Sequence, residues 1–308
     1  MKFWVGVTDN RWFNFLRGKG LDEVNFWQPS ARPMFTTIEP GTPFFFKLKK
    51  PLSRIGGYGT FVSFVRLPLS LAWETFGEKN GAASFAEFST LIRSLSPRPD
   101  EANPEIGCNL IAQPVFFDQD RLLAPPADWA SSIVRGKIYE DASQEGGRLI
   151  DVIKHHSAPD EVAAEERWQA GERVAEYSAP YLARARLGQG TFRALVTSAY
   201  GRKCAITGEN ILPVLEAAHI RPFSELGPSK MSNGLLLRSD FHKLFDLGYV
   251  TITPELRIEV SRKIREEWFN GKVYYRVHGQ ALASSPVDAW SRPNPEYLQW
   301  HNENRFQG

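Results

Sequence analysis

The chain has 308 residues, 42% of them hydrophobic and 23% charged, with a net charge of +2 and two cysteines. This composition is typical of a soluble globular protein of about two domains, because one domain takes roughly 100–200 residues. Two cysteines argue against a disulfide framework, and the lack of a long apolar run argues against a membrane span. The start of the chain shows no signal-peptide pattern, so the cytoplasm is the expected location.

The first half of the chain alternates short apolar runs with helical patterns. A run at residues 3–7 indicates a buried strand, and a short amphipathic helix at 11–17 should follow it. Further strands are expected at 23–28, 42–49, 60–65 and 107–117, and helices at 69–76 and 85–95. Strands with helices tucked between them favour a mixed β-barrel over a doubly wound sheet.

Three stretches of this half, WVGVTDNRWFNFL, EPGTPFFFKLKKP and IGGYGTFVSF, resemble the PUA-like superfamily, which includes SRA, EVE and ASCH domains. The resemblance implies a reader domain that holds a flipped, modified base in an aromatic-lined pocket. Trp4, Asn25, Trp27 and Tyr58 are the expected lining, with aromatic rings to stack on the base and an amide to read its edge. Each aromatic is equally consistent with a place in the hydrophobic core. Asp9 is more typical of a carboxylate that stabilises a turn than of one that reads a base.

Basic residues near the glycine-rich stretch at 56–59 form a candidate surface for contact with the DNA backbone. Lys47, Lys49 and Arg54 are the expected contacts, although a solvated face explains such a cluster equally well. Residues 1–157 contain 18 basic and 17 acidic residues, so their net charge is close to zero. A nearly neutral domain cannot bind DNA strongly through phosphates alone, so a base pocket should supply much of its affinity.

The character of the sequence changes at residues 158–176, which carry six acidic residues against two basic ones and read as a connecting helix. Positive charge follows, and Arg186 and Arg221 are further candidates for backbone contact. The expected domains are a reader at 1–157, a linker helix at 158–188 and a nuclease at 189–308.

The last third of the chain is organised around residues 204–248, CAITGENILPVLEAAHIRPFSELGPSKMSNGLLLRSDFHKLFDLG. Strands are expected at 203–207 and 214–220, joined through a Gly-Glu-Asn turn as a short β-hairpin. An irregular loop and one short helix should follow. Residues 249–253 and 257–260 should form a second hairpin, around which the tail wraps.

The short helix has candidate caps at both ends and two polar residues on one face. Ser239 or Asp240 can cap its start, and Gly248 lies where a left-handed C-terminal cap is expected. His242 and Asp246 are four positions apart, so their side chains can share a metal ion.

The order of His219, Asn233 and His242 on this frame resembles the HNH endonucleases, whose fold is the ββα-metal motif. The resemblance implies that His219 is the general base, Asn233 braces the loop that orients it, and His242 is a metal ligand. A histidine with a pKa near 6.5 can accept the proton of water at neutral pH. Within the family, the chain resembles the branch that fuses the nuclease to a reader domain in restriction enzymes.

One position departs from the family pattern. Many members carry Asp or another ligand directly before the base, where this chain has Ala218. Asp246 is therefore the favoured carboxylate ligand, and Glu216 is weaker because strand alternation turns it away from His219. One imidazole and one carboxylate leave most of the coordination shell open, which suits Mg²⁺ or Mn²⁺. A structural zinc ion would need a closed set of four protein ligands. The remaining histidines lack partners at metal-site spacing and are expected to be structural or exposed: His155, His156, His278 and His301.

The sequence thus predicts an α+β protein with an N-terminal PUA-like mixed β-barrel and a C-terminal ββα-metal nuclease domain. The predicted function is a modification-dependent endonuclease that cuts double-stranded DNA carrying a modified base such as 5-methylcytosine or 5-hydroxymethylcytosine. Joining reader and nuclease raises the local concentration of DNA at the nuclease. Two alternatives remain: an HNH nicking or homing enzyme that reads ordinary sequence, and a catalytically inactive nucleic-acid-binding protein, which Ala218 suggests. A homodimer is also open.

Overall fold

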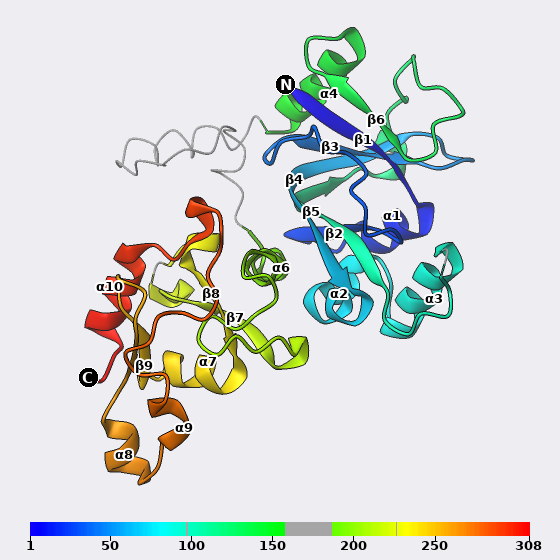
Figure 1. The fold of residues 1–308 in the computed structure, drawn as a ribbon. Coiled ribbons are helices and arrows are strands. Elements are labelled where there is room, and N and C mark those ends of the chain that lie inside the picture. The colour runs from blue at the N-terminus through cyan, green and yellow to red at the C-terminus, as the bar shows by residue number, and fades with distance from the viewer. Residues whose placement is uncertain (97, 158–186, 226) are drawn as a thin grey trace. The chain divides into compact units, whose positions relative to one another are not determined.

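The computed structural model describes residues 1–96, 98–157, 187–225 and 227–308. The chain divides into two compact units, Met1–Arg186 and Leu187–Gly308, which are coloured blue to green and green to red in Figure 1. The expected linker helix lies outside the described residues except for its last two positions. Among the helices that the structure describes, none is long and apolar enough to cross a membrane.

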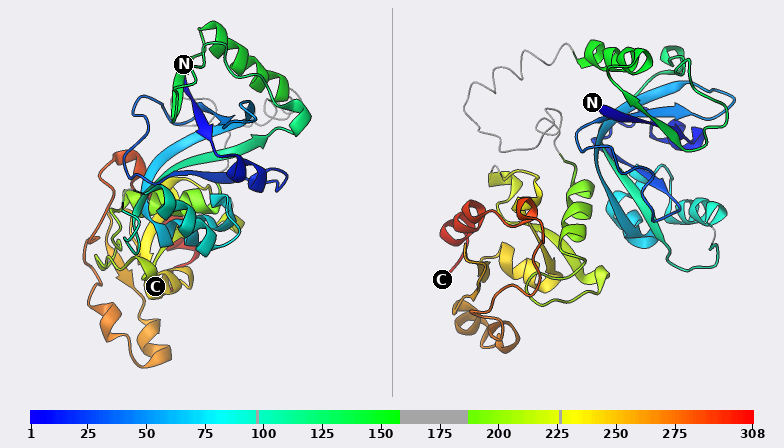
Figure 2. Two further views of the ribbon diagram at one scale, coloured as in Figure 1. Left: turned by 90° about the vertical axis from the view of Figure 1, so that its right-hand side faces the viewer. Right: turned by 45° about the horizontal axis from the view of Figure 1, so that its top comes forward.

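Unit 1 is built on one six-stranded mixed sheet with strand order β2-β5-β4-β3-β1-β6, in which β1 and β3 are parallel (Figures 1 and 2). Its strands are β1 Lys2–Thr8, β2 Glu23–Gln28, β3 Pro43–Leu48, β4 Ile55–Pro68, β5 Glu105–Phe116 and β6 Gly136–Glu140. Its helices are α1 Asn10–Leu16, α2 Leu69–Phe76, α3 Phe85–Leu95 and α4 Gln144–Ser157. The elements expected up to residue 117 are confirmed within a few positions, whereas β6 and α4 were not predicted.

Both faces of this sheet are buried. In β1, Phe3 and Val5 join one apolar cluster, while Trp4 between them joins another. In β3, Phe45 belongs to the first cluster and Phe44 to the second. Successive side chains point to opposite faces of a strand, so these strands fill two cores at once and read as continuous apolar runs.

Strand β4 is longer than expected because it runs through its glycines. Gly57 has φ +157°, and a Cβ there would lie 2.0 Å from the carbonyl oxygen of Val115 in β5. The two backbones approach so closely that only glycine fits. The sequence alone favours a loop for these glycines, before the strand expected at 60–65.

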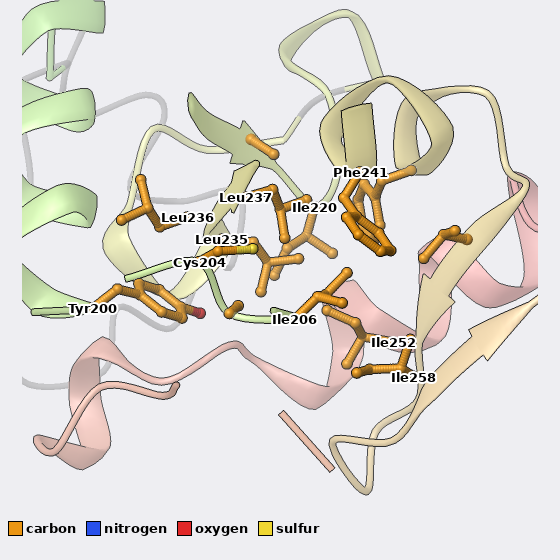
Figure 3. Packing of buried hydrophobic residues seen from close by; sticks show 14 of the residues in the cluster. Tyr200, Cys204, Ile206, Ile220, Leu235, Leu236, Leu237, Phe241, Ile252 and Ile258 are labelled. Carbon is orange, nitrogen blue, oxygen red and sulfur yellow. The ribbon is translucent and has the colours of Figure 1, made fainter. Parts of the chain in front are cut away.

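Unit 2 has two small sheets and a set of short helices around one apolar core (Figures 1 and 3). Its strands are β7 Leu215–His219, β8 Gly234–Arg238, β9 Val250–Ile252 and β10 Ile258–Val260. Its helices are α6 Gln189–Ala199, α7 Ser239–Asp246, α8 Lys263–Trp268, α9 Lys272–Tyr275 and α10 Pro295–Asn304. Figure 3 shows Leu237 of β8 and Phe241 of α7 in the same core as Ile252 and Ile258 of the second hairpin.

The first expected hairpin is wrong and the second is confirmed. Strand β7 pairs antiparallel with β8, with Ala217 opposite Leu236. The stretch expected as a strand at 203–207 is instead a turn, in which the backbone N–H of Gly208 donates to the carbonyl of Cys204 at 2.9 Å. The leucines of β8 follow a Gly-, Pro- and Ser-rich segment, so the sequence alone favours a loop there. Strands β9 and β10 pair as expected.

Helix α7 ends as expected but begins differently. Gly248 has φ +76°, the left-handed conformation that favours glycine, and a Cβ there would lie 2.0 Å from the Arg305 carbonyl oxygen. The N-cap residue is Arg238, which makes no side-chain capping bond. Asp240 lies inside the first turn and forms two hydrogen bonds to the Arg238 guanidinium, at 2.7 and 2.8 Å. The expected cap at Ser239 or Asp240 is therefore wrong.

Candidate active site

His219 closes strand β7 with its ring stacked flat on Phe192 of α6. The ring centroids are 3.9 Å apart and the planes differ by 10°. The Nε2 atom of His219 is buried and has no hydrogen-bond partner among the described residues. A buried polar atom left without a partner costs about 1–3 kcal/mol, and such an atom is typical of a catalytic position.

The electrostatic surroundings keep this ring neutral. Burial lowers the pKa of His219 below its ordinary value, His242 lowers it further, and Asp246 partly opposes both. The structure thus brings these three side chains within electrostatic reach of one another. A neutral imidazole has a lone pair that can accept a proton at neutral pH.

Asn233 is fully buried and ties together the loop that follows His219. Its Nδ2 donates to the carbonyls of Arg221 and Pro228, each at 2.9 Å, and its Oδ1 accepts the N–H of Arg221 at 2.9 Å. The N–H of Ile220 donates to the Asn233 carbonyl at 2.9 Å. The backbone directly after His219 is therefore fixed by this residue.

His242 of α7 has a carboxylate at each ring nitrogen. Its Nδ1 lies 2.6 Å from Oε2 of Glu216, and its Nε2 lies 3.5 Å from Oδ2 of Asp246. The short contact places an N–H at Nδ1, because an ionised carboxylate can only accept. The other ring nitrogen, Nε2, faces the Asp246 carboxylate.

Glu216 reaches the site through a contact that its sequence position does not predict. Its side chain contacts His242 rather than His219, so its orientation relative to His219 on the strand does not exclude it from the site. No spacing rule pairs Glu216 with His242 across 26 positions. Only the packing of α7 against β7 brings the two side chains together.

The donor set fits a hard divalent cation. Within the described residues, no three His, Cys, Asp or Glu side chains form a preassembled metal cluster. His242 Nε2 and the Asp246 carboxylate nevertheless present an imidazole and an oxygen donor on one helical face. Two such donors leave most of a coordination shell to water and phosphate oxygens, as Mg²⁺ and Mn²⁺ sites commonly do.

The expected DNA-backbone contact Arg221 is partly exposed and also makes two contacts within the protein. Its Nε donates to the Glu225 carbonyl at 2.6 Å, and its guanidinium lies 5.4 Å from the ring centroid of Trp300. The other nuclease-side candidate, Arg186, lies outside the described residues.

Three of the four expected reader residues lie in the interior of unit 1. Trp4 packs on Phe35, and Tyr58 belongs to the cluster on the other face of the sheet. Asn25 is fully buried, with its Nδ2 bonded to Asn80 Oδ1 at 2.8 Å. These side chains do not meet at one pocket, because alternation along the strands sends Trp4 and Tyr58 to opposite faces.

Unit 1 does contain a pocket, and Trp27 lines it. The cavity volume is about 250 Å³, just below the roughly 300–1,000 Å³ typical of small-molecule sites. Its apolar wall includes Trp12, Phe26 and Met34 beside Trp27. Gln28 also lines it, and its buried Oε1 has no hydrogen-bond partner among the described residues.

Charged residues stand around this pocket. The polar lining includes Asp9, Arg11, Lys49 and Arg135. Asp9 accepts the N–H of Arg11 at 2.9 Å as the cap of α1, and its other oxygen lies 2.9 Å from Lys49 Nζ. These contacts and the Lys49 ammonium lower the pKa of Asp9, although burial opposes them and is the largest single influence.

The other two basic candidates of unit 1 differ sharply. Lys47 is buried, its Nζ donates to Ser53 Oγ at 3.1 Å, and burial followed by the charge of Lys50 lowers its pKa. It does not offer its charge at the surface. Arg54 is exposed.

Residues 204–253 match the protein family described as HNH endonuclease. This stretch, which holds the candidate histidines, is therefore an HNH nuclease region. Comparison with curated proteins finds no match. Among solved structures, ASCH from Zymomonas mobilis is 12% identical with a TM-score of 0.32, covering 48% of this chain and 94% of that one. A structure described as the modification dependent TagI restriction endonuclease is 14% identical with a TM-score of 0.28, covering 99% and 81%.

Proposed function

We propose that this protein is a divalent-cation-dependent DNA endonuclease whose first unit recognises a modified base. The observation that carries the proposal is the environment of His219. A neutral imidazole, whose Nε2 has no hydrogen-bond partner in the part of the chain that the structure describes, lies within electrostatic reach of His242 and Asp246, inside a stretch that matches the HNH endonucleases.

The residues of unit 2 supply the parts that phosphodiester hydrolysis needs. His219 takes the proton of the attacking water, while Phe192 holds its ring and the Asn233 bonds hold its backbone. His242 Nε2 and Asp246 would hold the cation, which when bound neutralises charge that develops on the phosphate. Glu216 accepts the Nδ1 proton of His242 and so orients the ring toward that position.

The pocket of unit 1 is proposed as the reader. Trp27 can stack on a flipped base. Gln28 takes the role expected of Asn25, because Gln28 lines the pocket and its Oε1 has no hydrogen-bond partner among the described residues. Lys49, Arg11 and Arg135 in the lining can meet the flanking phosphates. Flipping costs a few kcal/mol, so a base that offers extra contacts should be favoured over an ordinary one.

The decisive experiment compares phage DNAs that are matched in sequence and differ only in cytosine modification. The full chain should cut the modified DNA in Mg²⁺ or Mn²⁺, cut the unmodified DNA far less, and cut neither in EDTA. Equal cutting of both DNAs would leave a nuclease that reads ordinary sequence. Cutting of neither DNA in any divalent cation would leave a nucleic-acid-binding protein without catalysis.

A further inference from the structure

The hairpin of α8 and α9 presents large apolar side chains to solvent at its tip. Trp268 is 66% exposed, Phe269 is 90% exposed and Val273 is 58% exposed. Phe269 also has φ +52°, a left-handed conformation that a bulky residue rarely adopts. Strained and exposed aromatic residues of this kind cluster at functional positions.

This tip is held firmly by the residues behind it. Tyr275 Oη donates to the Ser261 carbonyl at 2.8 Å and accepts the N–H of Arg265 at 3.2 Å. Tyr274 packs edge-on against Phe241, with 5.3 Å between the ring centroids. Because Phe241 directly precedes His242, the hairpin is packed against the helix that carries the candidate metal ligand.

The hairpin also concentrates positive charge. From 262 to 276 it carries five basic residues against two acidic ones. The basic residues are Arg262, Lys263, Arg265, Lys272 and Arg276. Of these, Lys263 is half-buried and the others are exposed. One of the two acids, Glu267, accepts a hydrogen bond from Tyr249 Oη at 2.5 Å.

We propose that the α8–α9 tip is a DNA-contacting wedge, in which Trp268 and Phe269 enter between base pairs while the surrounding cations bind the flanking phosphates. This inference rests on the proposed DNA endonuclease function. Proteins that bend DNA insert apolar side chains at base steps, and a wedge already held in shape loses little conformational freedom on binding. Exposed aromatics ringed by arginine and lysine match that chemistry.

A second copy of the chain is the competing occupant, and the charges disfavour it. A symmetric dimer places the same patch of both copies face to face. Five basic residues would then oppose the same five, with two acidic residues in each copy to compensate. Duplex DNA carries the opposite charge and has no such conflict.

The test measures binding of the full chain to a labelled duplex in EDTA, where no cutting occurs. The double variant Trp268→Ala with Phe269→Gly removes both rings, and glycine relieves the left-handed strain at 269. We expect it to bind at least tenfold more weakly with an unchanged salt slope. Lys272→Gln and Arg276→Gln should each reduce that slope by about 1. Trp290→Ala, at another exposed tryptophan of unit 2, is the control and should bind normally.

A duplex carrying 2-aminopurine at successive positions reports unstacking directly. Wild type and Trp290→Ala should each increase the 2-aminopurine fluorescence at one position, and the double variant should not. If the double variant binds DNA as tightly as wild type, the wedge proposal is wrong. Cation-dependent cutting by wild type would still support the nuclease proposal in that case. A change from dimer to monomer in sedimentation of the DNA-free double variant would also overturn it, in favour of the second copy. Weaker binding by the double variant without cutting by wild type would support the wedge and reject the nuclease.

Discussion

The sequence predicts a group of site residues in each unit, but the fold brings the group together only in unit 2. His219 and His242 come within electrostatic reach of each other because one short strand–loop–strand–helix segment carries both. Trp4 and Tyr58 separate because alternate positions on the strands of one sheet face different cores. Spacing within one local motif therefore determines side-chain geometry better than shared residue type across distant strands.

The largest expected effect is at His219. His219→Ala should lower cleavage by about 10²–10⁴-fold, because proton transfer from water loses its acceptor. DNA affinity should stay within a factor of two, and thermal unfolding should report the lost ring stacking on Phe192 separately. His278→Ala is the matched control, since its Nδ1 accepts only the backbone N–H of Val260 among the described contacts. Normal cleavage by His219→Ala would end the assignment of the base.

Substitutions of the two carboxylates beside His242 should reduce Mn²⁺ affinity to different extents. Asp246→Asn removes a proposed ligand and should nearly abolish Mn²⁺ binding measured by calorimetry. Glu216→Gln weakens the partner that orients the ring and should reduce Mn²⁺ affinity by about 10–100-fold. Glu255→Gln, at an exposed glutamate of the same unit, should have no effect. A silent Asp246→Asn together with a large Glu216→Gln effect would exchange the two roles.

Two tryptophan variants distinguish the proposed reader pocket of unit 1 from the hydrophobic core around it. Trp27→Ala should remove a stacking contribution of about 1–3 kcal/mol and with it the preference for modified duplex. Trp27→Phe should keep most of that preference. Trp4→Phe should leave it unchanged, because Trp4 is 6% exposed and packs inside the core. Competition binding at constant salt measures all three, and an unchanged preference in Trp27→Ala would reject the reader.

The smallest expected effect distinguishes the two units by acid stability. Burial is the main cause that lowers the pKa of His301 to about 4, from its ordinary 6.5. Above pH 6.5 the ring is neutral in the folded and in the unfolded chain, so its full contribution to the free energy of unfolding is present there. As pH falls from 6.5 toward 4, the unfolded chain binds the proton first, and unit 2 loses about 1 kcal/mol per pH unit. Hydrogen exchange should show residues 187–308 loosening before 1–157. His301→Leu should remove the His301 share of that pH dependence and leave the share of His219, whose pKa is also lowered by burial.

The sequence predicted elements well where periodicity was strong. The strand expected at 23–28 has the same bounds in the structure, because alternation and flanking turn residues agree there. Strand β8 was missed because Leu235 and its neighbours follow a loop-like segment and form a strand only by pairing with β7. The contact of Glu216 with His242 was unpredictable for the same reason, since tertiary packing alone creates it.

The amide of Asn233 closes the loop after His219 at its base, because it bonds both backbone groups of Arg221. Beyond such a closure, each doubling of loop length costs only about 0.6 kcal/mol in chain entropy. Ser224 and Glu225 are exposed in that outer part. A segment inserted between them would break the bond of Arg221 Nε to the Glu225 carbonyl, but it would leave the Asn233 bonds that hold the backbone after His219. The loop is thus a natural insertion point at which new target preference can be added without rebuilding the hydrolytic chemistry.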